Sequence, residues 1–83
     1  MSFKVKQMPI DIPTLLNKNK NKVIQLKIRD NKTIKGILQN FDIHMNLTLE
    51  NTEDISGIKV VKLGKILLRG NNIIIISFPE ESK

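Results

Sequence analysis

After Lys22 the chain changes to segments in which apolar residues recur at every second position, as at 24, 26 and 28 and at 45, 47 and 49. This period of two constrains the fold more than any other feature of the chain. Ile24, Leu26 and Ile28 alternate with polar or charged residues, which predicts a half-buried β-strand. Further strands are expected over residues 33–42, 45–50, 58–69 and 72–78, with turns at 30–32 and 70–71 and a polar loop at 51–57. We therefore expect a mostly β protein with five antiparallel strands.

Two glycines interrupt this alternation. Gly36 lies within the second expected strand and Gly64 within the fourth. A glycine inside a strand commonly marks a bulge or a sharp bend. Bent short strands joined by tight turns favour a small barrel over a flat sheet.

The segment before the strands predicts one short α-helix. Asp11 precedes Pro13, a residue that suits the first turn of a helix, and an alternating Asn-Lys run follows Lys18. We expect the helix over residues 13–18, with Leu15 and Leu16 docking it on the sheet. Residues 1–10 read as a flexible leader, residues 11–79 as a single domain, and residues 80–83 as a C-terminal tail.

The small size of the chain predicts self-association. A chain of 83 residues has a thin core, and this one has no cysteine and a single histidine, so disulfides, a metal site and other cofactors are not expected. The run Ile73–Ile76 does not alternate, which is typical of a strand covered on both faces. A second subunit pairing with a sheet edge would cover it; alternatively, the strand is central and the helix lies over its far face.

The charge and the terminal patterns bear on partners and location. The formal net charge is +6, which favours an anionic partner such as a phosphate backbone, although a biased genome composition would also produce it. No signal peptide pattern is visible, and no apolar run approaches the roughly 18 residues that span a bilayer. We expect a cytoplasmic protein that does not enter membranes.

Two short segments carry candidate binding chemistry. His44 and Asn46 stand two apart at the entry to an expected strand, which would direct both side chains to one face. An imidazole can stack on a base, and an amide can hydrogen-bond to the edge of a base. Arg69 ends the fourth expected strand beside Gly70, and guanidinium groups stack on bases and bind phosphate. Each segment also has an ordinary interpretation. The first would be a loop histidine with a turn-forming asparagine, and the second would be a plain hairpin turn.

Taken together, residues 36–47 and 63–73 resemble the two signatures of the Sm and Sm-like (LSm) family, and the resemblance covers about residues 11–78. It implies the Sm fold, an SH3-like small barrel, and a ring in which the fourth strand pairs with the fifth strand of the next subunit. Rings of archaeal and eukaryotic relatives usually have seven subunits and bacterial ones six. The compact chain resembles the subunits of archaeal homo-oligomeric rings more than it resembles eukaryotic spliceosomal subunits.

The resemblance also implies a uridine pocket at the inner rim of the ring. His44 and Arg69 would sandwich the base, Asn46 would hydrogen-bond the uracil edge, and Gly70 would let the ligand approach the backbone. Asn71 would contact the base or support Arg69. Asp42 and Met45 would be supporting residues. Lys18, Lys20 and Lys22 are candidate phosphate contacts or, alternatively, part of a solvated face.

The resulting hypothesis is an RNA-binding ring subunit that captures U-rich single-stranded RNA and scaffolds ribonucleoprotein assembly or RNA processing. The alternative is a protein-interaction or structural ring with little RNA binding of its own, and protein clients are compatible with both. Catalysis is not expected, because the single histidine has no serine or cysteine at a suggestive spacing.

Overall fold

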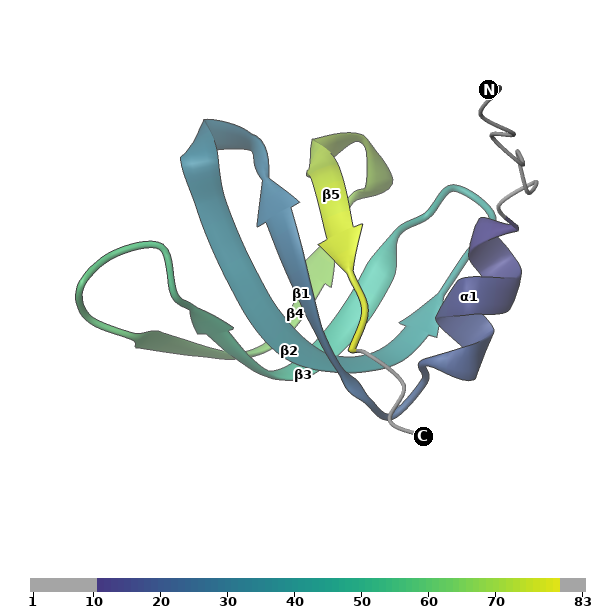
Figure 1. The fold of residues 1–83 in the computed structure, drawn as a ribbon, viewed down its shortest axis with the longest axis horizontal. Helices are drawn as coiled ribbons and strands as arrows, with labels where there is room; N and C mark the ends of the chain where they lie inside the picture. Colours follow the sequence, from purple (N-terminus) through teal and green to yellow (C-terminus); the bar gives the residue numbers. More distant parts are fainter. Residues whose placement is uncertain (1–10, 80–83) are drawn as a thin grey trace, which may run out of the picture.

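The computed structural model describes residues 11–79, and the expected leader and tail lie outside these residues. A short helix, α1 (Ile12–Lys18), precedes five strands that form one bent antiparallel sheet (Figure 1). The strands are β1 (Val23–Ile28), β2 (Lys32–Phe41), β3 (Leu47–Asp54), β4 (Val61–Leu68) and β5 (Ile73–Ser77), and their order across the sheet is β4-β3-β2-β1-β5. The predicted mostly β architecture is confirmed.

Helix α1 is held at both ends by side chains. At its N-terminus, the carboxylate of Asp11 accepts hydrogen bonds from the backbone N–H of Thr14 at 3.5 Å and from its hydroxyl at 2.6 Å, so the helix begins one residue earlier than predicted. At its C-terminus, the side-chain amide of Asn19 donates to the carbonyl oxygen of Leu15 at 2.8 Å. Leu16 is fully buried and fastens the helix to the sheet.

The core is formed by the alternating apolar side chains that the sequence pattern predicts. Its buried members are Leu16, Ile24, Leu26, Ile34, Leu38, Leu47, Leu49 and Leu68. These side chains come from α1 and from β1 to β4, so the concave side of the sheet encloses them. Fully burying each such side chain contributes about 1.5–3 kcal/mol.

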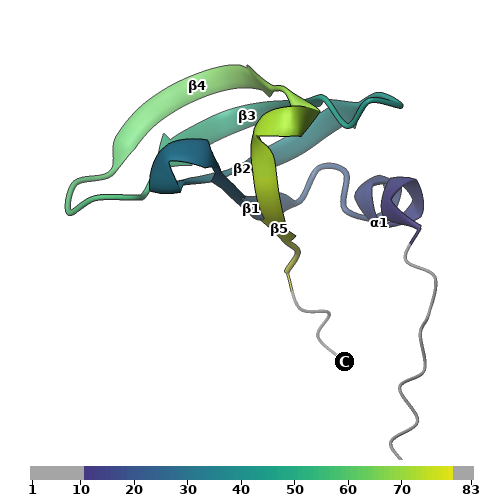
Figure 2. The ribbon, with the colours of Figure 1, turned by 90° about the horizontal axis from the view of Figure 1, so that it is seen from above.

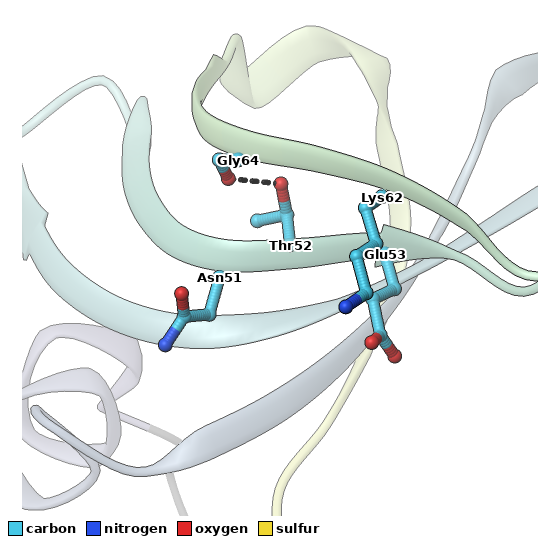
Figure 3. Close-up of a pocket in the computed structure, with 5 residues that line it drawn as sticks. All are labelled: Asn51, Thr52, Glu53, Lys62 and Gly64. Carbon is cyan, nitrogen blue, oxygen red and sulfur yellow. Dashed lines mark hydrogen bonds between the residues drawn. The ribbon is translucent and has the colours of Figure 1, made fainter.

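Both predicted glycine bends are present. The β2–β3 register shifts between Lys35 and Ile37, and a Cβ on Gly36 would overlap the methyl group of Thr52. Gly64 has φ +77°, a left-handed conformation that favours glycine, and its carbonyl oxygen accepts a hydrogen bond from the Thr52 hydroxyl (Figure 3). Figure 2 shows the resulting curvature, with β4 arching over the sheet.

Several element boundaries differ from the sequence-based prediction. Strand β3 continues to Asp54, so residues 51–54 of the expected polar loop are strand. Their polar composition suggested a loop, but Thr52 is buried between the two bends and pairs with Gly64. Strand β4 begins at Val61, three residues later than expected, and the turn after it is a short 3-10 helix, Gly70–Asn72.

The isoleucine run lies in an edge strand. Strand β5 pairs only with β1, so the alternative interpretation of a central strand is wrong. Ile74 and Ile75 are 59% and 53% exposed. The opposite edge, β4, exposes Val61 and Leu67 in the same way. Both sheet edges therefore present apolar side chains to solvent. No helix among residues 11–79 is long and apolar enough to span a membrane.

Candidate nucleic-acid interface

The loop between β2 and β3 is organised around the carboxylate of Asp42. One carboxylate oxygen accepts the backbone N–H groups of His44 and Asn46, each at 2.9 Å, and the other accepts the side-chain N–H of Asn46 at 3.0 Å. The backbone adds bonds from Met45 N–H to the Asp42 carbonyl at 3.0 Å and from Asp42 N–H to the Asn46 carbonyl at 3.2 Å. Met45 has φ +65°. Asp42 thus fixes the conformation of the 42–46 loop.

The same hydrogen bonds determine the charge of Asp42. The backbone N–H of Asn46 lowers the pKa of this carboxyl most, followed by the Asn46 side-chain amide. Desolvation opposes them, and the backbone N–H of His44 and the Coulomb interaction with this residue lower the pKa further. Hydrogen bonds to the charged form favour ionisation. Asp42 is therefore a carboxylate at neutral pH and acts as an acceptor only.

The 42–46 loop is joined directly to the turn after β4. The backbone N–H of Gly70 donates to the side-chain oxygen of Asn46 at 2.9 Å. A Cβ on Gly70 would collide with the carbonyl oxygen of His44 and would approach the Cβ and carbonyl oxygen of Met45 to 3.0 Å. The two loops are in backbone contact, and only glycine fits between them.

The structure brings the two predicted segments together at this junction. His44, Arg69 and Asn71 are exposed, and Met45, Asn46 and Gly70 are partly buried. The prediction that His44 and Asn46 share one face of a strand is wrong, because residues 42–46 form a turn and β3 begins at Leu47. Hydrogen bonding to Asp42 and Gly70, not strand alternation, orients Asn46.

The Asn46 amide keeps part of its hydrogen-bonding capacity. An amide side chain has two N–H donors and two acceptor lone pairs on its oxygen. Asp42 takes one donor and Gly70 takes one lone pair. One N–H and one lone pair of the amide remain for a ligand.

The three candidate lysines are exposed at and after the end of α1. Lys18 is in the last helical turn, and Lys20 places its ammonium nitrogen 5.7 Å from the centre of the Phe41 ring. This cation–π contact brings one of the three lysines next to the 42–46 loop. The structure does not bring Lys18 or Lys22 into a contact with the predicted site.

Two hollows adjoin the junction, and the sequence pattern predicted neither. One, of about 210 Å³, is lined by Asn40, Phe41, Asp42, Asn46, Thr48 and Leu67. The other, of about 340 Å³, is an apolar groove lined by Ile12, Met45, Gly70, Ile73, Ile74, Ile76 and Phe78. For the 210 Å³ hollow, the available sequence signal was the aromatic Phe41 directly before Asp42. The apolar groove forms where α1 and β5 meet, and no local sequence pattern predicts it. Among residues 11–79, no three His, Asp or Glu side chains gather as metal ligands would.

Comparison with known proteins agrees with this architecture. The LSM domain family model matches residues 14–78. An Sm-like snRNP protein of Methanococcoides burtonii is 33% identical over 70 residues, which cover 83% of this chain and 93% of the relative.

Two solved structures extend the similarity to three dimensions. A heptameric archaeal Sm protein is 39% identical and superposes with a TM-score of 0.76, covering 81% of this chain and 98% of its own. A Pyrococcus abyssii Sm protein in complex with a uridine heptamer is 28% identical, with a TM-score of 0.77 and coverage of 84% and 100%. The five-stranded bent sheet with its N-terminal helix is therefore the Sm fold, and the chain belongs to the LSM domain family of Sm and Sm-like proteins.

Proposed function

We propose that this protein is a subunit of a ring that binds U-rich single-stranded RNA, one nucleotide per subunit, and scaffolds ribonucleoprotein assembly or RNA processing. The observation that carries the proposal is the chain of hydrogen bonds from Asp42 through Asn46 to Gly70, because it joins the two loops that bear His44 and Arg69. The related Sm protein in complex with a uridine heptamer supports the choice of ligand. The proposal includes no catalytic step.

The orientation of the Asn46 amide favours uracil. Its remaining N–H can donate to a uracil carbonyl while its remaining lone pair accepts the uracil N3–H. Cytosine presents the opposite pattern at these positions, with an acceptor at N3 and an amino group beside it. Leaving such a polar group unsatisfied costs about 1–3 kcal/mol per pocket.

His44 and Arg69 supply the stacking surfaces of the proposed pocket. Both are exposed, and they lie on loops whose backbones are in contact at His44 and Gly70. Stacking one base contributes about 1–3 kcal/mol, so a single pocket binds weakly. Several identical pockets on one ring make later contacts intramolecular and raise the affinity by about 10²–10⁴.

The two open sheet edges support ring formation. Strand β4 exposes Val61, Leu63 and Leu67, and an apolar groove of about 340 Å³ lies beside β5. Unpaired, apolar strand edges are otherwise aggregation sites. The related heptameric archaeal Sm protein supports a ring of seven identical chains.

The experiment that tests the proposal is fluorescence anisotropy with labelled oligo-U and oligo-C, together with native mass spectrometry. We expect a ring that binds oligo-U tightly and oligo-C weakly, and reduced oligo-U affinity in His44→Ala and Arg69→Ala with the ring intact. Lys35→Ala is the matched control for Arg69→Ala, because it also removes one exposed positive charge but lies in the middle of β2. A ring that binds neither oligonucleotide would favour the protein-interaction alternative.

A further inference from the structure

The loop between β3 and β4, residues 55–60, projects from the sheet on the side away from α1 (Figure 1). We propose that in the ring this loop receives the chain that follows β5 of the adjacent copy, with Glu80 and Glu81 of that copy lying against Lys59 and Lys62. This inference rests on the ring of the proposed function. It adds an interaction surface, formed by the loop and the first residues of β4, beyond the pairing of β4 with β5 and the RNA pocket.

The base of the 55–60 loop is fixed to β2. The backbone N–H of Ile55 donates to the carbonyl oxygen of Thr33 at 2.9 Å, and the Thr33 N–H donates to the Ser56 hydroxyl at 2.8 Å. The Ser56 N–H in turn donates to the carboxylate of Asp54 at 3.0 Å. The loop is thus held in position and can serve as a docking element.

Beyond this base, the loop offers both apolar and basic groups. Ile58 is fully exposed and Val60 is 55% exposed. Lys59 and Lys62 are also exposed, and neither forms an ion pair among residues 11–79. Lys62 lies opposite Glu53 in the β3–β4 register, and Figure 3 shows the two side chains alongside one another. The lysine charges remain available to a partner.

The lengths of the edge strands leave the start of β4 uncovered in a ring. Strand β4 has eight residues and β5 has five. All four strand pairings within the chain are antiparallel. Because antiparallel pairs are slightly more stable than parallel ones, we take the pairing of β5 with β4 of the next copy as antiparallel too. If β5 of one copy begins opposite Leu68 of the next copy, its five residues end opposite Gly64 and leave residues 61–63 of β4 unpaired.

The direction of β5 therefore sends the following residues towards the 55–60 loop of the adjacent copy. Pro79 has no N–H and ends strand pairing, so the chain is free to leave the edge there. Phe78 packs against the core of its own chain, and Pro79 lines a hollow with Val23 and Lys35. The reach towards the loop therefore comes from Glu80 and Glu81, which span about 7 Å when extended. Glu80 and Glu81 are consecutive acidic residues, complementary in charge to Lys59 and Lys62.

Zero-length carbodiimide crosslinking tests this contact directly, because it joins only carboxylates and amines that touch. Rings refolded from a mixture of ¹⁵N-labelled and unlabelled chains distinguish contacts between copies from contacts within one. We expect mixed-isotope crosslinks from the 80–81 carboxylates to Lys59 or Lys62. Crosslinks of these carboxylates only to other lysines, or only within one chain, would overturn the inference.

Charge exchange provides the energetic test. We expect K59E/K62E and E80K/E81K each to raise the concentration at which the ring half-dissociates, by about 2- to 30-fold per interface, which is the range for two exposed ion pairs. Combining all four substitutions should restore the stability of the ring. The matched control K18E/K20E makes the same change in charge at the end of α1 and should not be rescued by E80K/E81K.

The outcomes separate this inference from the proposed function. A wild-type protein that is monomeric by native mass spectrometry overturns both. A wild-type ring in which the substitutions at 59, 62, 80 and 81 act independently overturns the tail contact alone. Unchanged ring stability in K59E/K62E together with weaker oligo-U binding would assign the lysines to RNA and also overturn it.

Discussion

The backbone N–H of Gly70 donates a hydrogen bond of 2.9 Å to the side-chain oxygen of Asn46, 24 positions earlier in the chain. This bond connects the turn after β4 to the 42–46 loop, whose conformation Asp42 fixes. It determines which end of the Asn46 amide faces Asp42 and which faces Gly70. The specificity of the proposed pocket thus depends on a backbone group as much as on the side chains that touch the base.

Replacing Gly70 by alanine should separate the two loops. The added Cβ collides with the backbone at His44 and Met45, so we expect a loss of about 1–3 kcal/mol in the free energy of unfolding and a loss of oligo-U binding. Urea denaturation and fluorescence anisotropy measure the two effects. Gly57→Ala is the control, because a Cβ at Gly57 meets nothing within 4 Å. Equal behaviour of the two variants would contradict the close contact at Gly70.

The Asn46→Asp variant should lose its preference for uracil. The substitution keeps the size of the side chain but replaces the amide donor with a second carboxylate beside Asp42, and it removes the N–H that would face a uracil carbonyl. We expect oligo-U affinity to fall by about 5- to 150-fold per pocket, the range for an unsatisfied polar group. Anisotropy with oligo-U and oligo-C measures this. A variant that still binds oligo-U as the wild type does would exclude Asn46 from base recognition.

The 42–46 loop should weaken at acidic pH. The pKa of Asp42 in the folded protein lies below its ordinary value of 3.8. A depressed folded pKa gives a stabilisation that is complete above the unfolded pKa and is lost as the pH falls through the folded pKa. We therefore expect the contribution of Asp42 to stability to be constant from about pH 7 to pH 5 and to be lost progressively as the pH falls below about 4.

Asp54 has a similarly lowered pKa, caused first by its hydrogen bond to the Ser56 side chain, so it contributes in the same window. Comparing urea denaturation of wild type, Asp42→Asn and Asp54→Asn across this range separates the two carboxyls. Each variant should show a weaker acid dependence than the wild type. An unchanged acid dependence in Asp42→Asn would mean that its carboxylate does not stabilise the folded state.

The Ile74→Lys variant should dissociate the ring without unfolding the subunit. Ile74 is 59% exposed on the free edge strand β5, so a lysine is tolerated in an isolated subunit but would place a charge in the apolar contact with β4 of the next copy. Native mass spectrometry should show monomers or small oligomers, and circular dichroism should show an unchanged β content.

Val23→Lys is the matched control for this variant. Val23 is 46% exposed and pairs with Ile37 of β2, and it lies on neither β4 nor β5. We therefore expect its lysine to lie outside the contact between β4 and β5 of adjacent copies. We expect Val23→Lys to form rings. Intact rings in Ile74→Lys would show that the β5 edge is not the contact between copies.

The sequence by itself determined the strand pattern, because alternation of apolar residues follows directly from the pleat of a strand. It also located both bends, at Gly36 and Gly64, since a glycine that breaks an alternating pattern commonly marks a bulge or a bend. The N-terminal helix followed from Asp11, Pro13 and the Asn-Lys run. The family resemblance selected His44, Asn46 and Arg69, although their contact with RNA stays a prediction.

Only the tertiary structure decided how the polar residues are used. Residues 51–54 looked like a loop, yet they form strand because Thr52 is buried and satisfied by the Gly64 carbonyl. The orientation of Asn46 depends on Gly70, and the groove beside β5 depends on α1, and such partners distant in the chain leave no local pattern. Local periodicity records which face of a strand is buried, whereas long-range hydrogen bonds and packing determine where each strand ends and what each polar side chain binds.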